Sequence, residues 1–127
     1  MAVTPIYAAL LAILFVVLSV RVIQVRRSLK VAIGAGGHPA LERAMRVQAN
    51  FAEYTPLALI LLAFCEMKGA PSLVIVLFGA ALLAGRVSHA WGVSQAEEDL
   101  RFRMVGMMLT FTVIGLMAAT LLVLAAR

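Results

Sequence analysis

The sequence predicts an all-α integral membrane protein, a bundle of four helices that each span the bilayer. Of its 127 residues, 64% are hydrophobic and only 13% are charged, whereas soluble domains are about 45–50% apolar and about 25% charged. Residues 1–127 are enough for one domain. A soluble domain this small has too much surface to bury so many apolar side chains. The composition therefore excludes a soluble enzyme, a disordered tail and a disulfide-stapled secreted module.

Three long uncharged stretches supply three of the expected spans, because about 20 apolar residues cross a bilayer. The first span covers residues 4–24, and basic residues follow it rather than precede it, unlike in a signal peptide. The third covers residues 70–91 and the fourth covers residues 102–126. All three are expected to stay in the mature protein as membrane helices.

The second expected span, residues 40–67, is polar in its first half and apolar in its second. Too few uncharged residues separate Glu53 from Glu66 for that stretch to cross the bilayer alone. Pro56 is the one signal for a break in this segment. We therefore expect one long helix that carries charge into the bundle and that is kinked or locally opened at Pro56.

The basic residues predict the topology. Nine of the eleven Lys and Arg residues lie in or beside the first connection, about 25–38, and the third, about 92–100, which also holds Glu97, Glu98 and Asp99. Loops rich in Lys and Arg stay in the cytoplasm, so both termini are expected on the other side. The net charge of +5 is explained in this way without nucleic acid as a partner.

The chain offers little for a metal or a disulfide. It has a single cysteine, Cys65, within an apolar run, and two histidines. One cysteine excludes an internal disulfide and any site built from several cysteines, and an apolar setting is typical of a packed thiol. We expect no metal site.

One face of the second helix is polar. At about 100° per residue, an arc of roughly 100° holds Glu42, Arg43, Arg46, Asn50 and Glu53. Ion pairs at a solvated helix end would explain the first three. The last two lie two to three turns deeper, where ionisable groups are costly and usually line a cavity or an interface. Arginine forks match carboxylates, so the set suits a zwitterion with several carboxylates and one amine.

The spacing of these residues resembles the signature of the MAPEG family, the membrane-associated proteins in eicosanoid and glutathione metabolism, of the microsomal glutathione transferase type. The matching residues are Glu42, Arg43, Arg46, Gln48, Asn50, Glu53, Tyr54 and Pro56. The resemblance covers essentially the whole chain, because basic residues at the ends of the other spans also match family landmarks. These are Arg26, Arg27, Arg86, Arg101 and Arg103.

The resemblance implies a homotrimer that binds glutathione between neighbouring protomers, near the cytoplasmic side. By likeness, the peptide would be held by Arg46, Asn50, Glu53 and Tyr54, and Arg26 or Arg27 would add a carboxylate contact. An arginine at the start of the last helix would face the sulfur. Both Arg101 and Arg103 qualify, and the spacing of Arg103 to Gly106 fits better. A guanidinium beside a thiol, whose free pKa is about 8.5, favours the reactive thiolate.

Three positions depart from family patterns. Two tyrosines of some glutathione-conjugating members correspond here to His89 and Val93, and a serine of the prostaglandin E synthases corresponds to Met104. His89 would then contact the ligand or move a proton, and the alternative is a helix-end histidine bonded to a backbone carbonyl. Prostaglandin synthase chemistry is disfavoured.

We therefore expect a glutathione-dependent transferase or peroxidase that acts on a lipophilic small-molecule substrate in the lipid, in a bacterial inner membrane. A non-catalytic lipid-binding or scaffold protein of the same fold is the alternative. A small four-span exporter of cations is less favoured, because the first span has no acidic residue and Glu53 lies among arginines.

Overall fold

The chain folds into four helices within residues 2–97 and 99–126, the parts that the computed structural model describes. Their bounds are α1 Thr4–Leu29, α2 Pro39–Met67, α3 Ser72–Ser94 and α4 Leu100–Ala125. Each is long and apolar enough to cross a membrane. The expected all-α class with four candidate spans is confirmed. Glu98 of the expected acidic loop and Arg127 lie outside the described residues.

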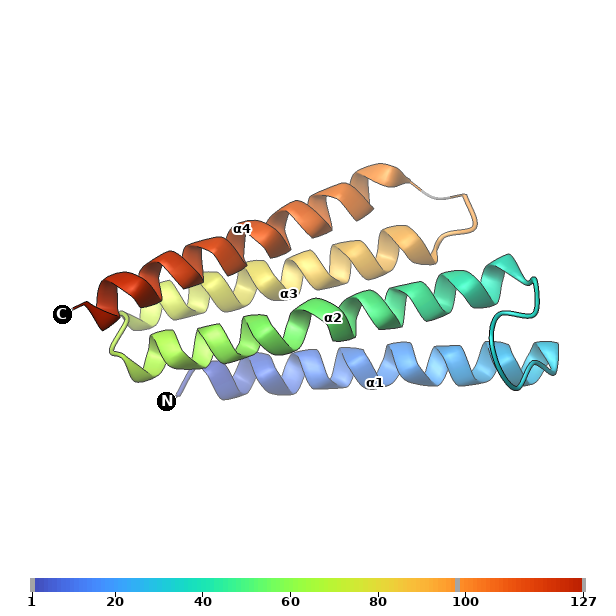
Figure 1. Cartoon of the computed structure of the whole chain (residues 1–127), viewed down its shortest axis with the longest axis horizontal. Helices are drawn as coiled ribbons and strands as arrows, with labels where there is room; N and C mark the ends of the chain where they lie inside the picture. The colour runs from blue at the N-terminus through green and yellow to red at the C-terminus, as the bar shows by residue number, and fades with distance from the viewer. Residues whose placement is uncertain (1, 98, 127) are drawn as a thin grey trace.

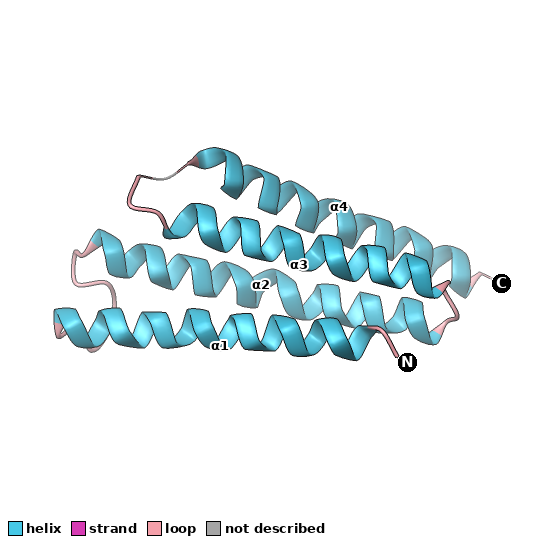
Figure 2. Ribbon diagram, turned by 180° about the vertical axis from the view of Figure 1, so that it is seen from behind, coloured by secondary structure: helices cyan, strands magenta, loops and turns pink. Residues whose placement is uncertain are grey.

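The helices lie side by side in chain order, as Figures 1 and 2 show from opposite sides. α1 packs on α2 and α4 packs on α3, and within the described residues α1 and α4 do not touch. The start of α1 and the end of α4 lie at one end of the bundle (Figure 1). The connections from α1 to α2 and from α3 to α4 lie at the other end, which brings the arginine-rich segments together.

Local chemistry sets where the helices begin and end. Proline stands at the start of α1 and α2 and immediately before α3, where its missing N–H costs no helical hydrogen bond. The carboxylate of Asp99 caps α4 by accepting from the backbone N–H of Arg101 at 3.0 Å. Lys30 ends α1 in the left-handed conformation, with φ at 55°.

The helices run beyond the expected spans. α1 continues past residue 24 to Leu29 and α3 continues past residue 91 to Ser94. The sequence limits were drawn from hydropathy, whereas backbone hydrogen bonding continues a helix into the polar interface until a cap ends it. The first connection is consequently shorter than the expected 25–38.

Pro56 lies inside α2 without dividing the helix. Its ring removes the N–H that would bond to the carbonyl of Ala52. At this level a hollow of about 270 Å³ opens between α1 and α2, lined by apolar groups that include Leu11, Phe15 and Phe51. The opening expected at Pro56 therefore coincides with a gap in the packing between two helices.

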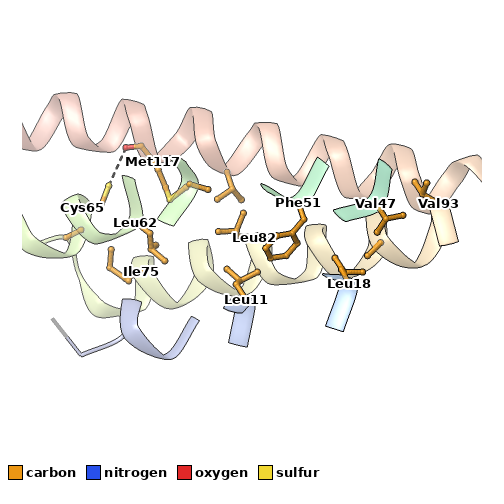
Figure 3. Packing of buried hydrophobic residues seen from close by; sticks show 14 residues of the cluster. Leu11, Leu18, Val47, Phe51, Leu62, Cys65, Ile75, Leu82, Val93 and Met117 are labelled. Carbon is orange, nitrogen blue, oxygen red and sulfur yellow. Dashed lines mark hydrogen bonds between the residues drawn. The ribbon is translucent and has the colours of Figure 1, made fainter. Parts of the chain in front are cut away.

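A row of apolar side chains fills the bundle from one end to the other (Figure 3). Leu11, Leu62, Ile75 and Leu82 have no exposed surface. Cys65 is also fully buried, as expected for a packed thiol, and its Sγ donates to the carbonyl of Met117 at 3.4 Å. Between membrane helices such close packing replaces the hydrophobic effect as the main attraction.

At the end opposite the arginines, Glu66 ties α2 to the start of α1. Its carboxylate accepts from the backbone N–H groups of Ala2, Val3 and Thr4 at 2.6, 2.8 and 2.8 Å. A carboxylate at a helix N-terminus satisfies donors that have no partner within the helix. This clamp fixes where α1 begins relative to α2.

Candidate functional site

The polar face of α2 points partly outward. Helix geometry places Asn50 about 16 Å and Glu53 about 21 Å along the axis from Pro39. Arg46 Nη1 lies 3.6 Å from Glu53 Oε1, and the two side chains are 60% and 50% exposed. The inner part of this face therefore carries an ion pair whose two side chains are about half exposed in the single chain.

Near the start of α2, side chains from three helices surround a hollow of about 250 Å³. We call it the arginine hollow, and its lining residues are Pro39, Glu42, Arg43, Arg46, Val93 and Arg103. Three guanidinium groups face one carboxylate, so the hollow has an excess of positive charge. Guanidinium groups bind carboxylates through paired N–H donors, so the arrangement fits an acidic ligand.

Glycine positions Arg103 at this hollow. A side chain at Gly92 of α3 would lie 2.7 Å from the backbone nitrogen of Arg103 and 2.8 Å from Cβ of Phe102. One turn further, a side chain at Gly106 of α4 would lie 2.5 Å from the backbone nitrogen of His89. α3 and α4 thus approach at backbone distance, as small residues allow between membrane helices.

The two candidate arginines of α4 lie in different places. Arg101 lines a separate hollow with Glu97 and Asp99. Arg103 lines the arginine hollow together with Arg46. Two residues apart on a helix, the side chains point about 200° apart, so only one of them can face a ligand bound at α2. Of the two, Arg103 is the one that lies beside α2.

Deeper in the bundle, Arg86 joins Asn50 to α3 and α4. Arg86 is 1% exposed, and its Nη1 donates to Asn50 Oδ1 at 2.7 Å while its Nε donates to Thr110 Oγ1 at 3.1 Å. Its guanidinium carbon lies 5.8 Å from the ring centre of Tyr54, which also packs edge-on against Phe111. Asn50 and Tyr54 therefore share Arg86 as a neighbour.

From the sequence, Arg86 is expected only as a basic residue at the end of a span, and no partner is predicted for it. A signal was present, because Arg86 is the one charged residue of the expected span 70–91, and ionisable residues within a membrane usually face the bundle interior. Arg43 and Glu42 belong to the polar face expected to suit a zwitterion, but the resemblance does not place them among the residues that would hold the peptide; both line the arginine hollow.

The other expected site residues lie elsewhere. Arg26 donates to the carbonyl of Gly34 at 2.7 Å and to Sδ of Met45 at 3.3 Å. Arg26 and Arg27 line a different hollow at the end of α1. His89 is 5% exposed and packs in the interface between α3 and α4. Within the single chain, the structure therefore brings Arg46 and Glu53 together and places Arg103 close to Arg46. Asn50 and Tyr54 form a second group, because both contact Arg86.

Comparison with known proteins agrees with the resemblance in the sequence. The model of the MAPEG family matches residues 4–123. Inner membrane protein YecN of Escherichia coli strain K12 is 37% identical over 115 residues, which cover 91% of this chain and 86% of the relative. The same protein of Escherichia coli O6:H1 matches with the same identity and coverage.

Proposed function

Because this chain belongs to the MAPEG family, we propose that it is a glutathione-dependent transferase or peroxidase for lipophilic molecules dissolved in an inner membrane. The observation that carries the proposal is the meeting of Arg103 with Arg43 and Arg46 in one hollow. These residues come from two helices and from distant parts of the sequence.

Glutathione has two carboxylates, one ammonium group and one thiol, and the arginine hollow together with the neighbouring Glu53 offers groups for each. Arg43 and Arg46 bind the carboxylates, and Glu53, already 3.6 Å from Arg46, takes the ammonium. Asn50 accepts from Arg86 through Oδ1, so its amide N–H groups are left to meet a peptide carbonyl beside Tyr54. Arg26 and Arg27 line another hollow of the same chain, so they would add their carboxylate contact only from a neighbouring copy, as the resemblance implies.

Arg103 faces the sulfur in this arrangement. A guanidinium within a few ångströms stabilises the thiolate and lowers the pKa of the thiol. In a transfer reaction the thiolate attacks an electrophilic carbon, a C–S bond forms and the leaving group departs with the bonding electrons. In a peroxidase reaction the thiolate attacks the terminal hydroperoxide oxygen, an S–O bond forms as the O–O bond breaks, and the lipid leaves as an alkoxide that takes up a proton to become an alcohol. The sulfenic acid formed is reduced by a second glutathione to give a disulfide and water.

We also propose that three copies assemble to complete the site. The arginine hollow measures about 250 Å³, below the roughly 300–1,000 Å³ typical of small-molecule sites. A neighbouring copy that covers the exposed faces of Arg46 and Glu53 would enlarge the wall around a tripeptide. The arginine-rich end faces the cytoplasm in this proposal, because Lys and Arg hold loops on that side.

The test is glutathione turnover by purified protein in lipid, with an aryl halide and with a lipid hydroperoxide as second substrates. Arg103→Ala is expected to lower turnover at least about 100-fold, as removal of a charge-stabilising donor does in other enzymes, and to reduce thiolate absorbance with little change in affinity. Arg101→Ala is the matched control, and turnover should stay near that of the unchanged protein. Equal losses in both variants would refute the assignment of the sulfur to Arg103.

A second candidate is a lipid-binding or scaffold protein that does not turn over. It is favoured by Val93, which lines the arginine hollow where some glutathione-conjugating relatives carry a tyrosine. An apolar side chain there supplies no hydroxyl near the thiol. Glutathione binding that Arg46→Ala abolishes, without turnover of either substrate, would support this candidate.

A further inference from the structure

The hollow between α1 and α2 beside Pro56 lies midway along the bundle and measures about 270 Å³. Leu11, Phe51 and Thr55 in its lining are buried, whereas Ala12 and Pro56 are exposed. Helix geometry places Thr55 about 24 Å from the start of α2 and about 18 Å from its end. The hollow therefore opens on the outer surface of the bundle, at the depth where a bilayer consists of hydrocarbon.

Small side chains and an aromatic pair leave this space open. The lining includes Ala8 and Ala12 of α1 and Ala52 of α2, whose methyl groups fill little volume. The rings of Phe15 and Phe51, which also line the hollow, stack with their centres 5.7 Å apart and keep the two helices separated. An apolar cavity of about 150 Å³ already binds benzene, so this larger hollow has room for a small lipophilic molecule.

Thr55 brings a hydroxyl group to this apolar lining. Thr55 is 3% exposed, and among the residues that the structure describes its Oγ1 has no hydrogen-bond partner. A hydroxyl inside a helix usually donates to the carbonyl four residues earlier, as Thr110 does to Gly106 at 2.7 Å in α4. Buried polar groups are nearly always paired, and an exception calls for an explanation.

Pro56 leaves a second polar group at the same place. Because the nitrogen of proline carries no hydrogen, the carbonyl of Ala52 lacks its usual donor within the helix, and Ala52 also lines the hollow. The hydroxyl of Thr55 can both donate and accept, whereas a carbonyl only accepts. These two groups together match a ligand group that accepts one hydrogen bond and donates another, as a hydroxyl does.

Neither water nor a lipid chain matches both features of the hollow. A water molecule could bond to the two polar groups, but it takes up about 30 Å³ and would leave most of the hollow empty. The remaining lining residues are all Ala, Leu, Phe or Pro, so further waters would find no partners there. An acyl chain would fill the apolar space and leave Thr55 without a partner. A molecule with an apolar body and one hydroxyl group satisfies both features.

We propose that this hollow binds a lipophilic molecule that carries one hydroxyl group and has the size of an alkylated phenol. The ligand hydroxyl accepts from Thr55 and donates to the carbonyl of Ala52, and the apolar body packs against Phe15 and Phe51. Thr55 follows Arg46 by nine residues and lies about 180° from it around α2. The ligand therefore lies on the side of α2 that is turned away from Arg46, and the proposal does not rest on the proposed function.

The experiment uses the protein in phosphatidylcholine nanodiscs and a phenol whose alkyl tail carries a photoreactive diazirine. After irradiation, mass spectrometry of peptides should place the label within residues 8–15 of α1 and 51–59 of α2. Excess para-butylphenol should protect these segments. Butylbenzene at the same concentration in the membrane should protect them about fivefold less, because a typical hydrogen bond is worth about that factor in affinity.

Thr55→Val keeps the shape of the side chain and removes only the hydroxyl group. It should lower labelling about fivefold and make the two compounds protect equally. Because this hydroxyl has no partner among the described residues, the melting temperature should be unchanged or higher, so a loss of labelling would not reflect unfolding. Thr112→Val makes the same change on the exposed surface of α4 and should label like the unchanged protein. Ala12→Leu should fill the hollow and abolish labelling.

Three results would overturn the proposal. Label found only outside the two segments would mean that a lipid chain or a second copy of the protein fills the hollow. Equal protection of the unchanged protein by para-butylphenol and butylbenzene would mean that the hollow does not recognise a hydroxyl group. Full labelling of Thr55→Val would mean that Thr55 makes no contact with the ligand.

Discussion

Replacing glycine by alanine is expected to change the stability in opposite directions at two positions of α4, because only one of them lies in the contact with α3. An alanine at Gly106 would place Cβ 2.5 Å from the backbone nitrogen of His89 and 2.6 Å from the carbonyl oxygen of Gly85. Both are backbone atoms, so no change of side-chain rotamer relieves the overlap. At Gly115, further along α4, nothing lies within 4 Å of an added Cβ.

The magnitudes follow from these distances. To reach an ordinary contact of 3.4 Å or more, α4 must retreat by roughly 1 Å at Gly106, and gaps of about 0.5–1 Å forfeit a quarter to a half of each dispersion contact. Overpacking of this kind costs about 1–3 kcal/mol, against a helix-propensity gain of about 1 kcal/mol for alanine over glycine. We expect Gly106→Ala to lower the free energy of unfolding by up to about 2 kcal/mol and Gly115→Ala to raise it by about 0.5–1 kcal/mol.

The assay is reversible unfolding in mixed micelles, with sodium dodecyl sulfate as the denaturant and circular dichroism as the readout. The two variants should shift the midpoint in opposite directions with the same slope. Gly106→Ala should also lower glutathione turnover, because the first turns of α4 carry Arg103. A Gly106→Ala protein as stable as the Gly115→Ala protein would refute the close approach of α3 and α4.

Two further predictions concern other contacts. Glu66→Ala removes the acceptor of three backbone N–H groups, so we expect it to lower the free energy of unfolding by about 2 kcal/mol and to speed hydrogen exchange at residues 2–4, as mass spectrometry would detect. Asn50→Ala removes the acceptor at 2.7 Å from the buried Arg86, so it should cost about 3 kcal/mol in the same unfolding assay. Glu53→Gln breaks only a half-exposed pair and should cost less than about 1 kcal/mol; equal losses in these two variants would contradict the buried role of Arg86.

The four helices were predictable because each is marked by features of its own local sequence. Long uncharged runs mark α1, α3 and α4, and proline or an aspartate cap stands where helices begin. Hydropathy does not mark where a helix leaves the membrane, so the expected ends at residues 24 and 91 fell short of Leu29 and Ser94. That limit is physical, because the backbone hydrogen bonds of a helix continue past the apolar residues until a cap ends the helix.

The candidate site was predictable only in part. The polar face of α2 follows from helix periodicity, which is a local property. Periodicity also shows that Arg101 and Arg103 face different sides, but which side meets α2 depends on how closely Gly92 lets α4 approach α3. Likewise, the pairing of Asn50 with Arg86 joins residues 36 positions apart, and no local pattern encodes it.

The ion pair between Arg46 and Glu53 sets a requirement on how the protein sits in a bilayer. In water, a pair with half-exposed side chains contributes at most about 1 kcal/mol. Against hydrocarbon, the same charges would each cost several kcal/mol unless water or protein covers them. α1 covers α2 on one side and α3 and α4 cover it on another, yet these two side chains remain 60% and 50% exposed. A second copy packed against this face would remove that cost and would also close the open side of the arginine hollow. We therefore expect assembly and glutathione binding to be lost together when Arg46 and Glu53 are both replaced by leucine.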